Sequence, residues 1–91
     1  MRIDKFLKVS RLVKRREIAK ELCEDQDVFL NGKPAKPSSE IAPGDELLLC
    51  LGRHRVKVRI KEIRTYSNKE NAADMYELIE DAVVNRGAED D

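Results

Sequence analysis

The chain has 91 residues, of which 41% are apolar, only 4% aromatic and 40% charged, and its formal net charge is zero. This length allows one domain with a modest aliphatic core and leaves no room for a deep active-site cleft. No apolar run approaches the roughly 20 residues of a membrane span, and the basic start lacks the continuous apolar region of a signal peptide. We therefore expect a cytoplasmic protein without a membrane partner.

The zero net charge hides an uneven distribution along the chain. Residues 1–64 hold 16 Lys and Arg against 10 Asp and Glu, a net charge of 16 − 10 = +6, and residues 65–91 hold 2 against 8, a net charge of 2 − 8 = −6. The first twenty residues alone hold eight cations and two acids, 8 − 2 = +6. A basic domain followed by an acidic tail predicts a polyphosphate partner for the basic part.

Two short helices are predicted within the basic segment. The first has residues at the i, i+3, i+4, i+7 spacing of a core-facing stripe: Ile3, Phe6, Leu7 and Ser10. The second begins near residue 14 and has its own apolar face: Ile18, Ala19, Leu22 and Cys23. The link over residues 10–13 is so short that the two helices should meet at a steep angle.

The second helix breaks two local rules. Lys14, Arg15 and Arg16 stand at its amino end, where the helix dipole disfavours cations by roughly 0.3–1 kcal/mol each. Arg16 and Lys20 then lie one turn apart as like charges. Free backbone N–H groups ringed by Arg and Lys suit a phosphate, and places where local rules fail are expected to be functional. A solvated basic face without a specific ligand is the alternative.

After a polar break over residues 24–27, the chain predicts short strands joined by tight turns. Asn31 and Gly32 both tolerate positive φ, so the strand over 28–30 should turn back directly into a return strand over 33–36. Pro34 cannot donate a hydrogen bond, which makes the return strand an edge.

Two longer strands should follow. The turn at residues 43–45 leads into a mostly apolar strand over 46–51, and residues 52–55 form a hairpin tip. Apolar and basic residues then alternate over 56–61, as in a half-buried strand. The alternation slips at residues 62–63, where we expect a bulge or the strand end.

Several potentially reactive or charged side chains are predicted to be structural or simply exposed to solvent. His54, the single histidine, lies between two arginines at the hairpin tip, where an exposed residue is favoured over a catalytic base. Cys23 and Cys50 lack the ligand spacing of a zinc site, so we predict no metal and two small buried hydrophobes. The basic row at 57, 59 and 61 either extends an RNA surface or is the wet face of the sheet, and the second is preferred.

A C-terminal helix is predicted after residue 66. Ser67 and Glu70 match a capping box, and Gly87 suits a C-cap. Between them runs an apolar stripe at helical spacing: Ala72, Met75, Tyr76, Ile79, Ala82 and Val83. We expect this helix to pack back on the domain.

Several segments, in this order, resemble the αL, or S-four-type, RNA-binding domain family. The resemblance covers roughly residues 1–50 and is carried by these segments: Arg2–Leu7, Arg11–Lys20, Val28, Asn31–Lys33, Lys36–Ser38 and Pro43–Asp45. It implies an α+β fold with two N-terminal helices packed on a small, mostly antiparallel sheet. With the predicted C-terminal helix, the domains become an RNA-binding domain over 1–65 and an acidic helix and tail over 66–91.

Within that family, RLVKRR near the start and NAADMY near the end are similar to the RqcP group of bacterial ribosome-associated quality control, which is related to the small heat-shock ribosome-rescue protein. This resemblance implies a non-catalytic factor without cofactors, monomeric off the ribosome. It would bind large (50S) subunits that carry peptidyl-tRNA through 23S rRNA and tRNA, and would support alanine tailing of the nascent chain by an RqcH-like partner. The more acidic carboxy terminus, over residues 77–91, departs from the group.

The resemblance also implies which residues face RNA. Arg2, Arg11, Lys14, Arg15 and Arg16 would face RNA, with Lys5, Lys20, Asn31 and Lys36 as supporting contacts, and Lys8 in the same basic segment is also expected to bind RNA. Few aromatic side chains are available for stacking, so recognition should rest on RNA shape and backbone, with a strong salt dependence.

Other functions remain open at this point. A general rRNA- or tRNA-binding factor of ribosome assembly or heat-shock recycling would carry the same motifs. An RNA-modifying enzyme would need a separate catalytic domain, for which 91 residues leave no room. A protein-interaction adaptor would instead use the acidic C-terminal segment.

Overall fold

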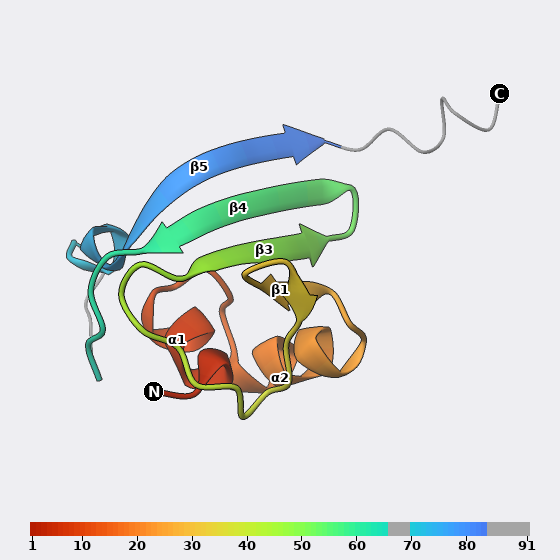
Figure 1. Cartoon of the computed structure of the whole chain (residues 1–91), viewed down its shortest axis with the longest axis horizontal. Helices are drawn as coiled ribbons and strands as arrows, with labels where there is room; N and C mark the ends of the chain where they lie inside the picture. Colours follow the sequence, from red (N-terminus) through yellow and green to blue (C-terminus); the bar gives the residue numbers. More distant parts are fainter. Residues whose placement is uncertain (66–69, 84–91) are drawn as a thin grey trace, which may run out of the picture.

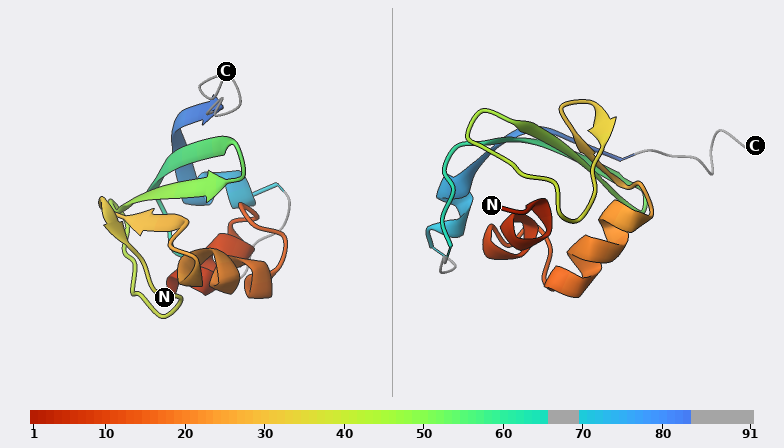
Figure 2. Two further views of the ribbon diagram at one scale, coloured as in Figure 1. Left: turned by 90° about the vertical axis from the view of Figure 1, so that its right-hand side faces the viewer. Right: turned by 60° about the horizontal axis from the view of Figure 1, so that its bottom comes forward.

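A computed structural model describes residues 1–65 and 70–83. Two helices, α1 (Ile3–Val9) and α2 (Arg16–Glu24), lie together against one face of an antiparallel sheet (Figures 1 and 2). Within the described residues the strand order is β2-β1-β3-β4-β5. The strands are β1 (Val28–Leu30), β2 (Lys33–Pro34), β3 (Glu46–Leu51), β4 (His54–Ile60) and β5 (Tyr76–Val83). The predicted α+β fold, two helices on a small antiparallel sheet, is confirmed.

The first helix buries the stripe that its spacing predicts. Ile3, Phe6 and Leu7 have no exposed surface. Ser10, just past the last turn, is also buried, and its hydroxyl donates to the carbonyl of Leu7 at 3.3 Å. The polar residue in the stripe is therefore satisfied locally, which is the condition for burying a hydroxyl without a large penalty.

The second helix buries a narrower stripe than predicted. Ala19 and Cys23 are buried, and Leu22 is half-buried. Ile18 is 43% exposed, so its predicted place in the core is wrong. Of the four residues in the predicted stripe, Ile18 lies farthest round the helix from Ala19 and Cys23 at 100° per residue, and this nine-residue helix turns mainly those two residues inward.

The hairpin between β1 and β2 follows the predicted turn chemistry. Asn31 and Gly32 have φ values of 51° and 86°, in the left-handed region that both residue types tolerate. The turn sets Leu30 opposite Lys33 and places β2 at one edge of the sheet. Pro34 thus lies on an edge strand, as predicted.

The core is a layer between the helices and the inner face of the sheet. Alternate residues of β3 and β4 point into it, and Glu46, Leu48, Lys57 and Arg59 take the intervening positions. The strand residues with almost no exposed surface are Val28, Leu47, Leu49, Val58 and Ile60. At about 25 cal/mol per Å² of apolar surface buried, this layer is the main stabilising term of the fold.

The predicted C-terminal helix is wrong over the described residues. Residues Ala72–Met75 form a single 3-10 turn, and Tyr76–Val83 form the strand β5, which pairs antiparallel with β4. Ala72 and Met75 are buried, as the helical stripe required, but Ile79 and Val83 are 40% and 62% exposed. The open edge of β4 supplies backbone hydrogen bonds along the whole segment, and this tertiary pairing outweighs a helical pattern in sequence.

The ends of that predicted helix, Ser67 and Gly87, lie outside the described residues, and the domain boundary at residue 65 stays a prediction. The register of β5 against β4 shifts between Lys57 and Val58, several residues before the expected irregularity. Strand β4 ends at Ile60, so the slip in alternation at 62–63 marks sequence beyond the strand. No helix among the described residues is long and apolar enough to cross a membrane.

Candidate nucleic-acid interface

The basic residues of α1 lie at its start and along its outer side. Arg2 is the N-cap of α1, and its backbone forms an antiparallel bridge with Glu40, which fixes the start of the helix to the loop before β3. Lys8 is exposed and Lys5 is half-buried. Because the opposite side of α1 is buried, these cations can face only solvent or a partner.

The joint between the helices adds three more cations, Arg11, Lys14 and Arg15, all exposed. Arg15 is the N-cap of α2, and its side chain makes no capping hydrogen bond. The first turn of α2 therefore keeps its positive dipole end without a side-chain acceptor from its own N-cap.

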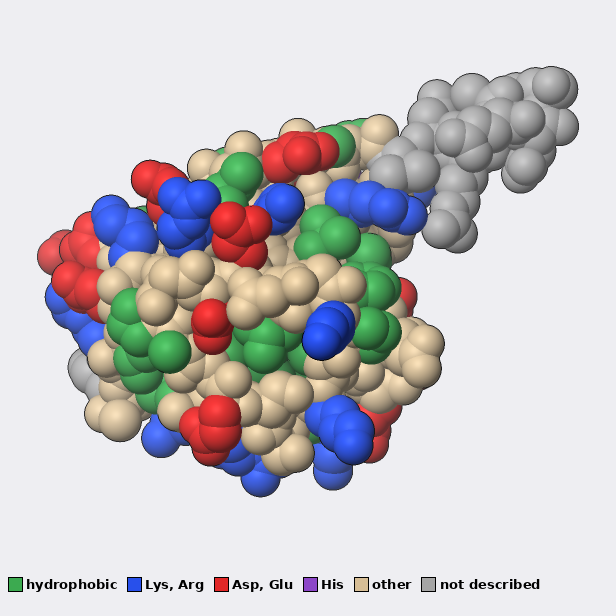
Figure 3. All heavy atoms as spheres, in the orientation of Figure 1, with side chains coloured by type: hydrophobic (Ala, Val, Ile, Leu, Met, Phe, Trp, Pro, Cys, Tyr) green, Lys and Arg blue, Asp and Glu red, His purple; other side chains and the backbone are tan. Residues whose placement is uncertain are grey.

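Helix α2 begins at Arg16, and Lys20 lies one turn later on the same side, also exposed. In the space-filling view, Lys and Arg side chains lie along the lower edge of the molecule, below the two helices (Figure 3). The cations of α1, the joint and α2 are all carried by the two helices and the link between them, and we call this set the helical basic surface: Arg2, Lys5, Lys8, Arg11, Lys14, Arg15, Arg16 and Lys20.

Two members of the helical basic surface are paired with a carboxylate. Asp4, only 2% exposed, accepts hydrogen bonds from Arg2 at 3.2 Å and from Arg16 at 3.3 Å. The other six have no ion pair with any carboxylate among residues 1–65 and 70–83. Within the described residues, direct ion pairs therefore neutralise only a small part of the positive charge of this surface.

Asp4 lies in the first turn of α1, where the helix dipole favours a carboxylate, but its contacts with the two arginines could not be predicted from the sequence. Arg2 and Arg16 are fourteen positions apart, and no local pattern links either of them to Asp4 as a pair. The left-handed backbone of Arg11, with φ 64°, was likewise not predicted. The contact of Asp4 with Arg16 exists only because α1 and α2 meet, whereas the conformation of Arg11 belongs to the end of α1.

Asn31 and Lys36, the two expected RNA contacts outside the helices, have different surroundings. The side-chain oxygen of Asn31 accepts from the backbone N–H of Glu46 at 2.9 Å, and its amide nitrogen donates to Asp45 at 3.2 Å. Asn31 therefore ties the β1–β2 turn to the start of β3. Lys36 is exposed in the loop after β2 and has no ion pair with a described residue.

The basic row on the outer face of the sheet is largely neutralised. Glu46 lies 3.4 Å from Lys57 and 3.1 Å from Arg59, and Arg59 also lies 3.4 Å from Glu77. Hydrogen bonds from Arg59 and Lys57 hold the pKa of the Glu46 carboxyl below its ordinary value. These contacts favour the interpretation that this row is the solvent-exposed face of the sheet rather than an extension of the RNA surface.

The Glu46 pairs predict an acid-range pH dependence of stability. The folded carboxyl has a lower pKa than the unfolded one, so the pairs stabilise the fold above the ordinary carboxyl pKa, and this contribution is lost as the pH falls through the lowered folded-state pKa. Glu46→Gln should flatten the fall in melting temperature between neutral pH and about pH 3. Glu21→Gln, at an exposed acid without a described partner, is the control and should leave the curve unchanged.

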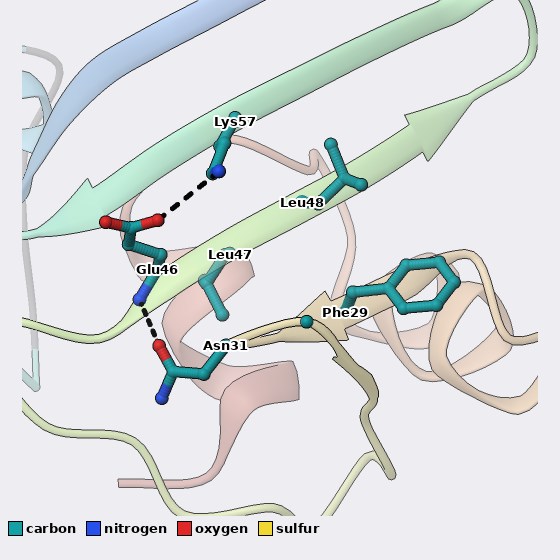
Figure 4. Close-up of a pocket in the computed structure, with 7 residues that line it drawn as sticks. Phe29, Asn31, Glu46, Leu47, Leu48 and Lys57 are labelled. Atoms are coloured by element: carbon teal, nitrogen blue, oxygen red, sulfur yellow. Dashed lines mark hydrogen bonds and ion pairs between the residues drawn. The ribbon is translucent and has the colours of Figure 1, made fainter.

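A shallow hollow of about 630 Å³ lies on the sheet near the β1–β2 turn (Figure 4). Phe29, Leu47 and Leu48 supply its apolar part, and the Glu46–Lys57 pair lies at its side. Among the described residues there is no group of three or more His, Cys, Asp or Glu side chains that could hold a metal ion. The hollow thus offers apolar surface and one ion pair.

The potentially reactive side chains outside the basic surface have unremarkable surroundings. Cys23 is buried as predicted, and burial, with the nearby acids Asp4 and Glu24, raises the pKa of its thiol to about 11. Cys50 is half-buried, less than predicted. His54 is exposed at the hairpin tip, as predicted, 3.8 Å from Asp81.

Arg11 is expected to lower the stability of the fold slightly while its charge increases the affinity for RNA. Its φ of 64°, just after the C-terminal end of α1, is a position where glycine is usual. An L-residue in the left-handed conformation costs roughly 1–2 kcal/mol, which glycine avoids. Glycine loses more conformational entropy on folding, however, and this offsets about 0.5–1 kcal/mol of the gain. Arg11→Gly should therefore leave the free energy of unfolding unchanged or raise it by up to about 1.5 kcal/mol in urea titrations. RNA affinity should fall, and the slope of log affinity against log salt should shrink by about 0.7–0.9.

Gln26 offers a matched control at the end of α2. It has φ 61°, its N–H donates to the carbonyl of Cys23 at 3.1 Å, and the next N–H donates to Leu22 at 2.8 Å, which is a Schellman motif. Gln26→Gly should give a similar gain in stability and leave RNA binding unchanged. Equal losses of RNA affinity in both variants would show that the guanidinium group of Arg11 is not responsible.

Comparisons with known proteins agree with this architecture. A model of the S4 domain family matches residues 1–47. The RQC P-site tRNA stabilizing factor of Bacillus subtilis (strain 168) is 47% identical over 81 residues, which cover 89% of this chain and 94% of that protein. The protein of the same name from Halalkalibacterium halodurans is 42% identical over 86 residues, 94% of this chain and 98% of that protein.

Among solved structures, the trimeric structure of Vibrio cholerae Heat Shock Protein 15 superposes with a TM-score of 0.82 at 29% identity, covering 87% of this chain and 81% of that one. The S-four-type resemblance, and the narrower resemblance to the quality-control group, are both confirmed. The chain therefore belongs to the S4 domain family and, within it, to the family of the RQC P-site tRNA stabilizing factors.

Proposed function

We propose that the protein is a non-catalytic RNA-binding factor of ribosome-associated quality control, which binds large ribosomal subunits that still carry peptidyl-tRNA. The observation that carries this proposal is the helical basic surface, six of whose eight cations have no carboxylate partner in the described chain, in a family whose members are named for stabilising P-site tRNA. The protein acts in the cytoplasm while associated with the ribosome.

The chemistry of the surface suits folded RNA. Guanidinium groups donate in a planar fork that matches phosphate oxygens, and they also stack on splayed bases. The chain has only two Phe and two Tyr and no Trp, and Phe6 is fully buried, so stacking on aromatic rings contributes little. Binding through phosphates and RNA shape fits 23S rRNA and tRNA, with the eight residues of the helical basic surface and Lys36 as contacts.

Asn31 is proposed as a contact of a second kind. Its side-chain amide holds the β1–β2 turn against β3, so its direct role toward RNA would use the remaining donor and acceptor capacity of the amide. Its main contribution would be to fix the turn beside the RNA.

A stabilising factor acts by binding rather than by chemistry. A protein that contacts rRNA and peptidyl-tRNA together makes the tRNA dissociate more slowly, because leaving would break both sets of contacts. We propose that this retention supports the addition of a C-terminal alanine tail by an RqcH-like partner. The group that adds the residues belongs to the partner and the subunit, and this protein needs no cofactor.

We propose a monomer off the ribosome. The edge strand β5 presents Glu77, Glu80 and Asp81, and antiparallel pairing of two copies along it would bring these acids together. Like charges opposed across strands destabilise such pairing.

A second candidate is a heat-shock recycling or ribosome-assembly factor, which the superposition on Heat Shock Protein 15 favours. The two candidates differ in what the bound subunit carries. A quality-control factor should prefer subunits with peptidyl-tRNA in place, whereas an assembly factor should prefer vacant or immature subunits.

Sedimentation with purified subunits tests the proposal. Labelled protein is mixed with large subunits carrying peptidyl-tRNA, with vacant large subunits and with small subunits. The tRNA-loaded subunits should bind about tenfold tighter than the vacant ones, equivalent to a coupling free energy of about 1.4 kcal/mol. Equal affinity for loaded and vacant large subunits would favour the recycling or assembly role, and equal affinity for all three would reject both.

A further inference from the structure

The carboxylate of Asp4 occupies an unusual place in the helical basic surface. Its side chain is only 3% exposed, although Asp4 lies in the first turn of α1 and its two arginine partners are about half exposed. One oxygen, Oδ2, accepts from Nη2 of Arg2 at 3.2 Å, and the other, Oδ1, accepts from Nη2 of Arg16 at 3.3 Å. Each oxygen therefore holds a different arginine, one from the start of α1 and one from the start of α2.

The two arginines remain available to a ligand. The side chains of Arg2 and Arg16 are each 48% exposed. A guanidinium group has five N–H donors, and the contact with Asp4 uses one of them, so most of the fork is left for phosphate oxygens. The carboxylate thus limits the rotation of both side chains without covering them.

The backbone on both sides of this cluster is also fixed. Next to Arg2, the N–H of Ile3 donates to the carbonyl of Ser39 at 2.8 Å. Arg2 itself bridges to Glu40, and Arg16 begins a regular helix. The two guanidinium groups consequently have a set separation and direction before any RNA arrives.

Electrostatics alone argues against an acid at this position. A carboxylate beside RNA phosphates repels them, so a surface that bound RNA only through its charge would be stronger without Asp4. Burying a carboxylate also carries a desolvation cost that its partners must offset. The neighbouring cations Lys14 and Arg15 have no such partner among the described residues.

We infer that Asp4 is a positioning residue, which holds Arg2 and Arg16 as one oriented pair for phosphates of the folded ribosomal RNA and so provides selectivity for that RNA over other polyanions. This inference rests on the proposed function, because it takes the large subunit as the specific target. Asp4 itself does not contact the RNA. It converts two mobile charges into one oriented pair.

The test compares Asp4→Asn with Glu17→Gln, which removes the same charge from an exposed position in the first turn of α2 that has no ion pair with a described residue. Each protein is titrated against large subunits carrying peptidyl-tRNA and against a poly(A)·poly(U) duplex. Glu17→Gln should bind both RNAs as tightly as the unchanged protein or slightly tighter. Asp4→Asn should bind the duplex equally well or tighter and the subunits about tenfold more weakly, the loss of one charge-assisted hydrogen bond.

Several results would overturn the inference. Equal loss of affinity for both RNAs would assign Asp4 a structural role only, and unchanged affinity for both RNAs would assign it none. If Asp4→Asn does not fold, Arg16→Lys decides, because it keeps the charge and loses the planar fork. It should weaken subunit binding about tenfold, whereas Arg53→Lys, at an exposed arginine near the β3–β4 turn and outside the helical basic surface, should leave it unchanged. Equal losses in these two variants would reject the oriented pair.

Failure of the proposed function gives a different result. In that case the unchanged protein itself would bind the loaded subunits no tighter than the duplex, which would overturn both the function and the role of Asp4. A clear preference of the unchanged protein for subunits that persists in Asp4→Asn would overturn the positioning role alone.

Discussion

Replacing Arg2 and Arg16 together by alanine is expected to lower affinity for tRNA-loaded large subunits by about a hundredfold or more. The estimate takes about 1.5–3 kcal/mol for each lost charge-assisted hydrogen bond to a phosphate. The slope of log affinity against log salt should also shrink by about 1.4–1.8, because two phosphate contacts are lost. Sedimentation with subunits at several salt concentrations measures both quantities.

The same double variant should also be less stable, because it leaves the buried carboxylate of Asp4 without its described partners. We expect a loss of about 2–3 kcal/mol in the free energy of unfolding, below the range for a fully buried ion pair because the arginines are half exposed. Adding Asp4→Asn removes the stranded charge and should restore most of that stability. It should not restore binding, which separates the effect on folding from the effect on RNA.

The charge-matched control is Arg53→Ala with Arg55→Ala. Both side chains are exposed near the β3–β4 turn, and neither has an ion pair with a described residue. This variant removes two positive charges away from the helices and should keep most of the affinity for subunits. An equal loss in the two double variants would mean that total charge, rather than the helical basic surface, determines binding.

The second large effect concerns Met75, whose replacement by alanine should destabilise the protein by about 2–5 kcal/mol. Met75 has no exposed surface and belongs to the core, and its carbonyl accepts from the N–H of Lys61 at 2.8 Å. Truncation leaves a cavity beneath the start of β5. Urea unfolding followed by circular dichroism measures the loss.

Leu78→Ala is the control for this prediction. Leu78 lies three residues later on β5 and is 54% exposed, so its truncation should cost less than about 1 kcal/mol. Similar costs for Met75→Ala and Leu78→Ala would contradict the placement of Met75 in the core. The same structure bears on the adaptor hypothesis: deleting residues 67–91 would remove Met75 and the partner strand of β4, so a loss of ribosome binding in that deletion would not identify a docking segment.

Much of the N-terminal part could be predicted from local patterns. The stripe of α1, the left-handed turn at Asn31 and Gly32, and the strands β3 and β4 each follow from residues within one element. A helix face, a turn type and a strand alternation are decided by neighbours three or four positions away at most. The polarised charge of the first twenty residues likewise needs no structure to be noticed, and it is sufficient to predict a polyanionic partner.

The C-terminal segment and the details of the interface could not be predicted in this way. Residues Tyr76–Val83 carry a helical apolar period, yet they form a strand because the edge of β4 offers a backbone partner. The pairing of Asp4 with Arg16 exists only because α1 and α2 meet, and the exposure of Ile18 depends on how narrow a stripe α2 buries. By itself the sequence determined the local elements and the position of the charge, because both depend on nearby residues. Only the tertiary structure decided which segments pair and which charges are oriented, because those depend on contacts between residues far apart in the chain.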